Sequence, residues 1–202
     1  MSDAVTFPAV PTDRLESGGW VERDRQVETV FRLPTARVRG ATLVFDDERS
    51  REALREATGL DRQVRFFFAT RLHFEPPLPS GVGAAMILPS VRSASRDNFA
   101  AALRDRGLVD VSRERTERVR VNSGDRARLT RYGARLPLEG GAETPVTGWV
   151  GAWHGDGFRV AGGAYPTRPL AETLELADPP AALARDGAAY REELLDLLRS
   201  VS

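Results

Sequence analysis

Alternating apolar and polar positions predict most of the strands in this chain. Residues 20–33 and 37–45 show the period of two that a half-buried strand requires, with a turn at Pro34-Thr35-Ala36 between them. Residues 63–75 alternate most clearly, with large apolar side chains on one face and Arg65, Arg71, His73 and Glu75 on the other, which predicts one wet or partner-facing side. The same signals predict four later strands, at residues 109–122, 126–138, 144–154 and 158–165.

Apolar residues spaced for one face of a helix predict three longer helices, at 48–58, 95–106 and 187–201. Asp46 or Asp47 is placed to cap the first, Ser95 to cap the second, and a glycine follows each of these two helices. Residues 76–91 are expected to form a proline-rich loop. Two interpretations of its apolar part stay open: a core strand at 82–88, or an exposed tip that touches a partner through Val82, Met86 and Ile87.

These elements together predict an α+β fold. Consecutive strands joined by short turns imply an antiparallel β-sheet of about six to seven strands, and the apolar stripes of the helices must pack on it. We expect a single domain over residues 20–202. Residues 1–19 are expected to form an irregular arm, with a helical turn after Thr12 that ends at Gly18-Gly19.

The second half of the chain resembles the Mog1/PsbP-like superfamily, which includes lipoproteins of the LpqN type. The similar pieces are the helix around FAAAL, the hairpin VRVNSGDRARLTRYGA, the strands GWVGAWHGDGFRVAGGAYP and the closing helix YREELLDLLRSV, within residues 93–202. The resemblance implies a layered sandwich whose members are mostly non-catalytic and dock onto other proteins. The whole chain is also similar to uncharacterised proteins of halophilic archaea, which implies no function.

Composition excludes several function classes. All 29 basic residues are arginine, and the chain contains neither lysine nor cysteine. The missing lysine excludes a P-loop, a protein kinase site and Schiff-base chemistry. The missing cysteine excludes disulfides, thiol nucleophiles and cysteine-ligated zinc. No cofactor is expected, and neither a targeting segment nor a membrane span is recognised, so we expect a cytoplasmic protein.

The two histidines offer the only recognisable catalytic or metal-binding candidates. His154 and Asp156 flank a glycine turn, and this pair is the basis of an alternative hypothesis, a metal-assisted hydrolase. The structural interpretation is a hairpin turn. His73 and Glu75 share a strand face, which is typical of an exposed histidine beside a paired glutamate. Whether the two histidines meet in space is left open by the sequence.

Two further patterns point to binding. Trp149 and Trp153 fall on one strand face, where they either line a pocket or pack under a helix. Residues 113–135 hold eight arginines, and their spacing aligns Arg118 and Arg120 across the hairpin with Arg126 and Arg128. This surface suits an acidic protein partner or nucleic-acid phosphates, although aromatic residues for base stacking are nearly absent. A solvated face, paired with Glu114, Glu117 and the acidic C-terminal region, is the alternative.

The expected function is that of a non-catalytic interaction module, an adaptor, chaperone or assembly subunit. Its predicted contact residues are Arg118, Arg120, Arg126, Arg128, Val82, Met86 and Ile87. A nucleic-acid binder acting through the hairpin at 113–135 and the hydrolase described above remain the alternatives.

Overall fold

A computed structural model describes residues 5–34, 36–79 and 81–202 of the chain. In chain order the elements are α1 (Thr12–Gly18), β1 (Trp20–Leu33), β2 (Ala36–Asp47), α2 (Glu48–Thr58), β3 (Phe66–Glu75), α3 (Ala84–Asp105), β4 (Val109–Arg120), β5 (Arg126–Pro137), a 3-10 turn (Glu139–Gly141), β6 (Glu143–Gly155), β7 (Gly157–Pro166), α4 (Leu170–Thr173) and α5 (Gly187–Arg199).

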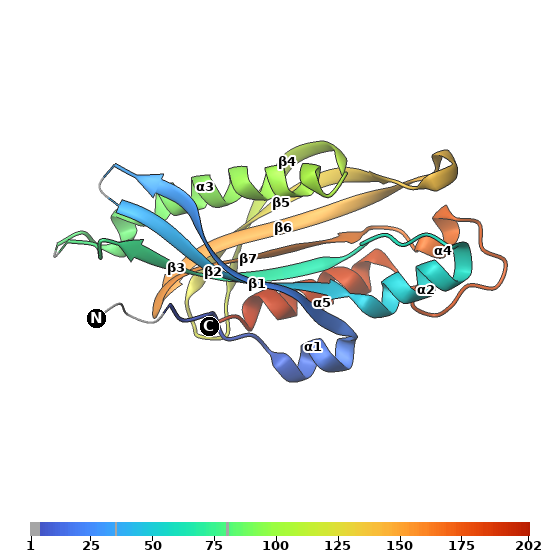
Figure 1. The fold of residues 1–202 in the computed structure, drawn as a ribbon, viewed down its shortest axis with the longest axis horizontal. Helices are drawn as coiled ribbons and strands as arrows, with labels where there is room; N and C mark the ends of the chain where they lie inside the picture. The colour runs from blue at the N-terminus through green and yellow to red at the C-terminus, as the bar shows by residue number, and fades with distance from the viewer. Residues whose placement is uncertain (1–4, 35, 80) are drawn as a thin grey trace.

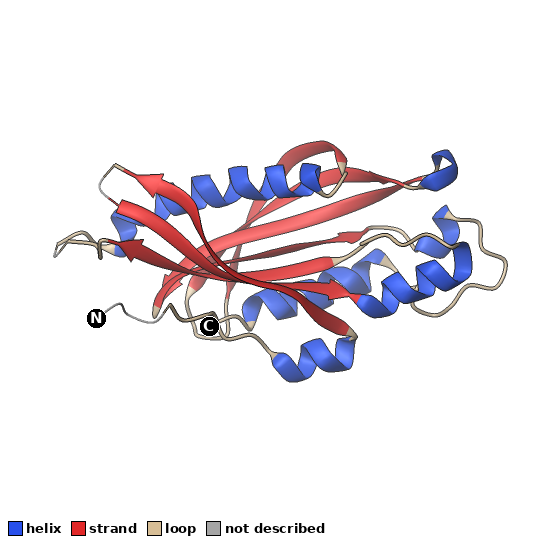
Figure 2. Cartoon of the chain, in the orientation of Figure 1, coloured by secondary structure: helices blue, strands red, loops and turns tan. Residues whose placement is uncertain are grey.

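The seven strands form one antiparallel sheet in the order β1-β2-β3-β7-β6-β5-β4 (Figure 1). Every neighbouring pair is antiparallel, and only the β3–β7 pairing joins strands that are distant in the chain. The helices lie on both sides of the sheet (Figure 2). The predicted α+β class with an antiparallel sheet is therefore confirmed.

Each face of the sheet has its own apolar core. The face under α3 packs Phe99 and Leu103 of that helix against Phe66, Tyr132 and other sheet residues. The opposite face packs the stripe of α5 against other strand residues, and Trp149 and Trp153 are fully buried there. The prediction that these two tryptophans pack under a helix is confirmed.

The prediction that one face of residues 63–75 is wet is wrong at Arg65. This side chain is 2% exposed on the α5 side of the sheet. Its guanidinium pairs with Asp47 at 2.5 Å and with Glu193 of α5 at 3.1 Å. The alternation predicts the strand correctly, but helix α5 covers its second face, and there Arg65 is buried between two carboxylates.

Helix α2 begins and ends where the sequence predicts. The Asp47 carboxylate accepts a hydrogen bond from the Ser50 backbone N–H at 3.0 Å, which satisfies one of the free donors at the helix start. Gly59 follows the helix with φ of 80°, a conformation that glycine adopts without a steric penalty. Asp186 caps α5 in the same way, through the Ala189 backbone N–H.

The expected loop at 76–91 is wrong over its second half, and so is the core strand at 82–88. Helix α3 begins at Ala84 and includes Pro89. Ser95 therefore lies inside the helix instead of capping it, and its hydroxyl donates to the Val91 carbonyl at 2.7 Å. The helical stripe extends upstream through Ile87 and Val91, both of which pack into the α3-side core. The prolines of this segment favour a loop, but the burial of Ile87 and Val91 outweighs the cost of Pro89 within the helix.

The helical conformation of this segment predicts a stability gain for Pro89→Ala. Proline lacks the N–H that would donate to the Ala85 carbonyl, and it costs about 3 kcal/mol relative to alanine in a helix interior. Part of this is offset because proline also restricts the unfolded chain. We expect urea unfolding to show a gain of about 1–2 kcal/mol, against less than about 0.5 kcal/mol for Ser90→Ala. A loss of stability in Pro89→Ala would contradict the helix.

Within the described residues, no helix is both long enough and apolar enough to cross a membrane.

Candidate functional site

The β4–β5 hairpin places four of the predicted contact arginines directly opposite one another. Arg118 faces Arg128, and Arg120 faces Arg126, in the register of the two strands. Directly opposite residues in an antiparallel pair point to the same face, as do residues two apart on one strand. All four guanidinium groups therefore lie on one side of the sheet, and the predicted alignment is confirmed.

Helix α3 adds to this group from the same side of the sheet. Arg92 and Arg96 line one small cavity together with Arg128. Arg113 is opposite Tyr132, whose hydroxyl donates to the Arg96 carbonyl at 3.1 Å. We call the resulting surface the basic face. It consists of Arg92, Arg96, Arg113, Arg118, Arg120, Arg126 and Arg128.

No side chain of the basic face forms an ion pair within the part of the chain that the structure describes. The predicted pairing of hairpin arginines with Glu114 and Glu117 occurs, but at Arg131 and Arg115, which are not part of the basic face. A bulge between Arg113 and Thr116 shifts the register. Glu114 then pairs with Arg131 at 3.1 Å, and Glu117 pairs with Arg115 and with α5. The carboxylates of β4 thus form their ion pairs on the α5 side of the sheet.

The arginines of the basic face act on one another. Burial lowers the pKa of Arg92, and the positive charges of Arg128 and Arg96 lower it further. An arginine keeps its proton under any physiological condition. The repulsion therefore raises the free energy of the folded state, because no arginine loses its proton to relieve it.

This repulsion predicts that Arg128→Glu stabilises the isolated protein. The substitution replaces a like-charged cross-strand pair by an opposite one, which is worth a few tenths to about 1 kcal/mol. We expect Arg118→Glu to have the same effect. The double variant restores a like-charged pair and should lose the gain, so the four proteins form a double-mutant cycle in urea unfolding. Additive gains in the double variant would show that the two side chains do not interact.

The three apolar contact residues predicted at 82–87 differ in how deeply they are buried. Met86, in the first turn of α3, is 69% exposed. Ile87 packs against the α3-side core, and Val82 is half-buried in the preceding turn. Met86 alone of the three is a prominent exposed side chain near the start of the helix that also holds Arg92.

The structure does not assemble a catalytic pair from the histidines. The His154 ring packs edge-on against Phe158 at 4.6 Å between centroids, on the α3 side of the sheet. Asp156 is 3.7 Å from Arg71 instead. His73 Nε2 lies 2.9 Å from the Thr6 carbonyl oxygen on the other face, so the two histidines do not meet. Among the described residues, no three histidine or acidic side chains group closely enough to hold a metal ion.

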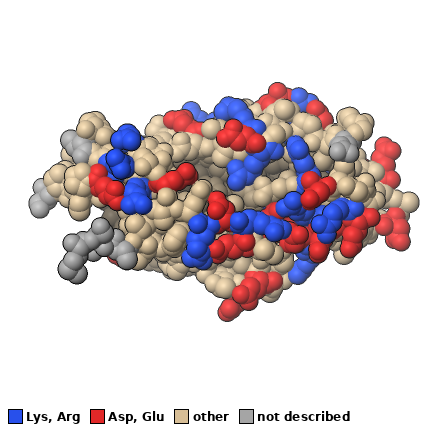
Figure 3. Space-filling model, in the orientation of Figure 1, with Lys and Arg blue, Asp and Glu red and all other residues tan. Residues whose placement is uncertain are grey.

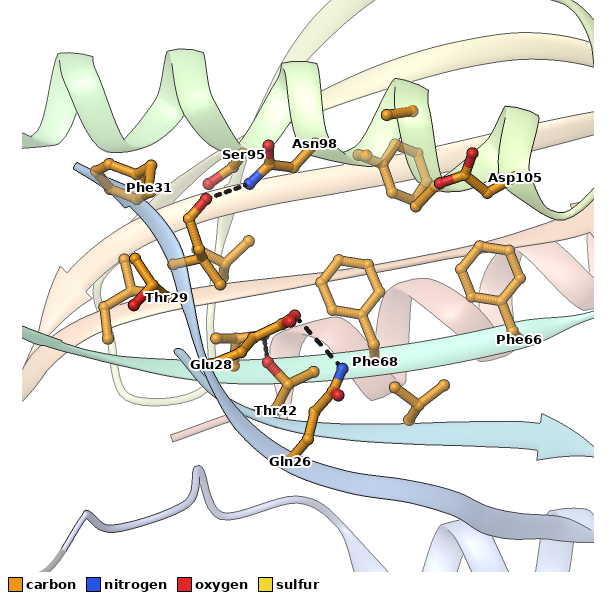
Figure 4. Close-up of a pocket in the computed structure, with 18 of the residues that line it drawn as sticks. Gln26, Glu28, Thr29, Phe31, Thr42, Phe66, Phe68, Ser95, Asn98 and Asp105 are labelled. Atoms are coloured by element: carbon orange, nitrogen blue, oxygen red, sulfur yellow. Dashed lines mark hydrogen bonds between the residues drawn. The ribbon is translucent and has the colours of Figure 1, made fainter. Parts of the chain in front are cut away.

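A cavity of about 360 Å³ lies between α3 and strands β1–β3 (Figure 4). Phe66, Phe68 and Phe99 line its interior. Some of its polar groups have partners within the protein: Asn98 donates to the Val30 carbonyl at 3.0 Å, and the Thr42 and Thr70 hydroxyls are 2.9 Å apart. Gln26, Glu28 and Asp105 also line the cavity, so its wall combines aromatic rings with amide and carboxylate groups. Sequence reasoning missed it because its walls come from five separate elements, α3, β1, β2, β3 and β7.

Charges elsewhere on the molecule are mixed. On the face that Figure 3 presents, basic and acidic side chains are interspersed. Ion pairs such as Arg51–Asp61 at 2.5 Å and Arg39–Glu75 at 2.8 Å join strands and helices outside the basic face. A charge-neutral chain thus holds a group of cations that its own carboxylates do not neutralise.

Comparison with protein families gives one match, which covers residues 7–202. The matching model is described as Domain of unknown function (DUF6517). The chain belongs to this family. Neither the curated proteins nor the solved structures contain a match to the chain. Membership in DUF6517 assigns no activity, and the resemblance to the Mog1/PsbP-like superfamily stays a prediction.

Proposed function

We propose that this protein is a non-catalytic interaction module that docks onto an acidic surface of another protein through the basic face. One observation carries the proposal: seven arginines share one face, and no carboxylate of the described chain pairs with any of them. Such a group of like charges costs stability in the isolated protein. An acidic partner would remove that cost and would gain charge-assisted hydrogen bonds.

The character of the surrounding surface favours a protein over single-stranded nucleic acid. Base stacking needs exposed aromatic rings beside the cations. Tyr132, the aromatic residue of the hairpin, is 4% exposed and its ring packs on Phe99. Arginine is also enriched in protein interfaces, where its planar group forms bidentate bonds with carboxylates.

The large cavity beside α3 supports a small-molecule binding function less well than the basic face supports protein docking. Thr42, Thr70 and Asn98 at its wall have partners inside the protein, and Gln26 donates to Glu28 at 3.4 Å. A selective small-molecule site places free polar groups at its wall to orient a ligand. The arginines of the basic face, in contrast, form no ion pair within the described residues.

Charge reversal tests the proposal. In one variant Arg118, Arg120, Arg126 and Arg128 become glutamate. A matched control reverses Arg14, Arg32, Arg37 and Arg168, four exposed arginines outside the basic face, and so has the same net charge. Each protein is used for affinity capture from its native cell extract, with nuclease treatment in a parallel sample. Protein partners are quantified by mass spectrometry and nucleic acid by absorbance.

We expect the wild type and the control to capture the same protein in stoichiometric amount, and the basic-face variant to lose it at least tenfold. Circular dichroism must show that both variants are folded. Equal capture by both variants would refute the assignment of the basic face. Loss of all captured protein after nuclease treatment would replace the protein partner by nucleic acid.

A further inference from the structure

A second group of arginines lies on the opposite side of the sheet from the basic face. Arg71 of β3 and Arg159 of β7 are directly opposite in the strand register. Ala69 and Ala161, two residues away on the same strands, belong to the α5-side core, so both arginines point to that side. A Cβ atom placed on Gly157 would be 3.1 Å from Arg159 Nη1 and 3.9 Å from Arg71 Nη2. The two guanidinium groups therefore converge on one point.

Arg159 is buried without a counter-ion. Its side chain is 4% exposed, and its Nε has no hydrogen-bond partner. Its one hydrogen bond within the described chain is a long one of 3.4 Å from Nη1 to the Phe158 carbonyl. Burial lowers the pKa of Arg159, and the charge of Arg71 lowers it further. A buried cation without a partner is costly, because water no longer solvates it.

The nearest carboxylate does not compensate for this charge. Asp156 lies in the β6–β7 turn, where its side chain is 98% exposed and 3.7 Å from Arg71. Such an exposed pair contributes little. Asp156 nevertheless sits at the entrance, where it would compete with an anion from outside.

An open cavity of about 320 Å³ gives access to both arginines. Its other walls include Phe7 and Ala9 of the N-terminal arm, Ser123 and Asp125 of the β4–β5 turn, Trp153, and Ser202. The Asp125 carboxylate accepts a hydrogen bond from the Ser123 hydroxyl at 2.8 Å. The arm and the C-terminal residue lie side by side (Figure 1), and Ala9 and Ser202 exchange backbone hydrogen bonds of 2.7 and 3.1 Å. The wall is thus a fixed part of the fold.

We infer that this cavity binds a tetrahedral oxyanion with two negative charges, such as a phosphate group, between Arg71 and Arg159. Two guanidinium groups from adjacent strands reach the same point beside Gly157. A tetrahedral anion can offer a pair of oxygens to each, whereas a planar carboxylate is satisfied by a single guanidinium fork. The site is separate from the basic face and does not depend on the proposed protein partner.

Phosphate titration of the full chain tests this inference. Thermal unfolding and calorimetry are measured with inorganic phosphate, sulfate or acetate, at an ionic strength held constant with sodium chloride. The variants are Arg71→Gln, Arg159→Met and Asp156→Asn. Arg168→Gln is the matched control, since Arg168 is exposed and outside the cavity. The fourfold variant of the basic face is included because its arginines could also attract phosphate.

We expect phosphate and sulfate to raise the melting temperature of the wild type, of Arg168→Gln and of the basic-face variant. Arg71→Gln should weaken phosphate binding at least about tenfold, the cost of one charge-assisted hydrogen bond. Arg159→Met should lose the phosphate effect and melt higher than the wild type in phosphate-free buffer, because it removes an unpaired buried charge. Asp156→Asn should bind phosphate several-fold more tightly.

Three results would overturn the inference. One is the absence of a phosphate effect at constant ionic strength in the wild type. Another is a phosphate effect in Arg71→Gln and Arg159→Met as large as in the wild type, which would place the anion elsewhere. The third is an acetate effect as large as that of phosphate, which would contradict the tetrahedral dianion.

Discussion

Replacing Arg65 by alanine is expected to destabilise the fold by about 3–5 kcal/mol, since it leaves buried carboxylates without their cation. Arg65 and Asp47 are each 2% exposed and their side chains are 2.5 Å apart. The guanidinium also packs on the Tyr190 ring at 4.0 Å and on Trp20 at 4.8 Å. It therefore links β3, the start of α2 and helix α5, and its removal should loosen all three.

Urea unfolding measures this loss, with Arg55→Ala as the control. Arg55 pairs with Glu52 at 3.6 Å, and both side chains are at least half exposed, so we expect a loss of less than about 1 kcal/mol. Equal losses in the two variants would contradict a special role for the buried pair.

The same network sets a pH dependence. Burial by itself would raise the pKa of Glu193, but Arg65, the Trp20 indole N–H and Arg185 hold it below its usual value. A carboxyl whose pKa is lower in the folded state contributes stability that is complete above its unfolded pKa, about 4.3, and is lost as pH falls through the folded value. Glu193→Gln should therefore cost stability at pH 7 and progressively less below about pH 4. A constant difference across this range would contradict the assignment.

Phe99→Ala is expected to cost about 3–5 kcal/mol, as other buried phenylalanine deletions do. Phe99 is 2% exposed, and its ring centroid lies 5.5 Å from that of Tyr132 and 6.0 Å from that of Phe68. The ring also rests on Gly148, where an added Cβ would be 2.9 Å from it. Phe99 thus fixes α3, and with it Arg92 and Arg96, on the sheet.

Met86→Ala, on the exposed side of the same helix, is the control for Phe99→Ala. We expect a change within about 0.5 kcal/mol, because Met86 is 69% exposed. Chemical denaturation of both variants gives the comparison. A Phe99→Ala loss no larger than that of Met86→Ala would show that α3 is not anchored through this ring.

Local sequence patterns were sufficient to predict the strands and the alignment of four of the seven arginines of the basic face. The turn at 122–125 and the alternation on either side of it determine which hairpin residues are opposite, so the alignment of Arg118 with Arg128 is readable from the sequence. The contribution of Arg92 and Arg96 cannot be predicted from the sequence, because it depends on where helix α3 crosses the sheet. The bulge that moves Glu114 to the other face left no recognised sequence signal.

Tertiary contacts explain the remaining errors. Arg65 looked solvent-facing because its partners, Asp47 and Glu193, are far away in the chain. The prolines of residues 76–91 and the capping signal of Ser95 predict a shorter helix α3, whereas Ile87 and Val91 continue its buried stripe upstream. The convergence of Arg71 and Arg159 depends on the β3–β7 pairing, which joins strands that have α3 and strands β4–β6 between them in the chain.

The most direct measurement of the central claim is an arginine footprint of the protein with its captured partner. A dicarbonyl reagent modifies exposed guanidinium groups, and mass spectrometry compares the free protein with the complex. The account predicts that modification of Arg118, Arg120, Arg126 and Arg128 falls several-fold in the complex, while that of Arg14, Arg32, Arg37 and Arg168 stays unchanged. Unchanged modification of the basic face, with protection elsewhere on the chain, would contradict it.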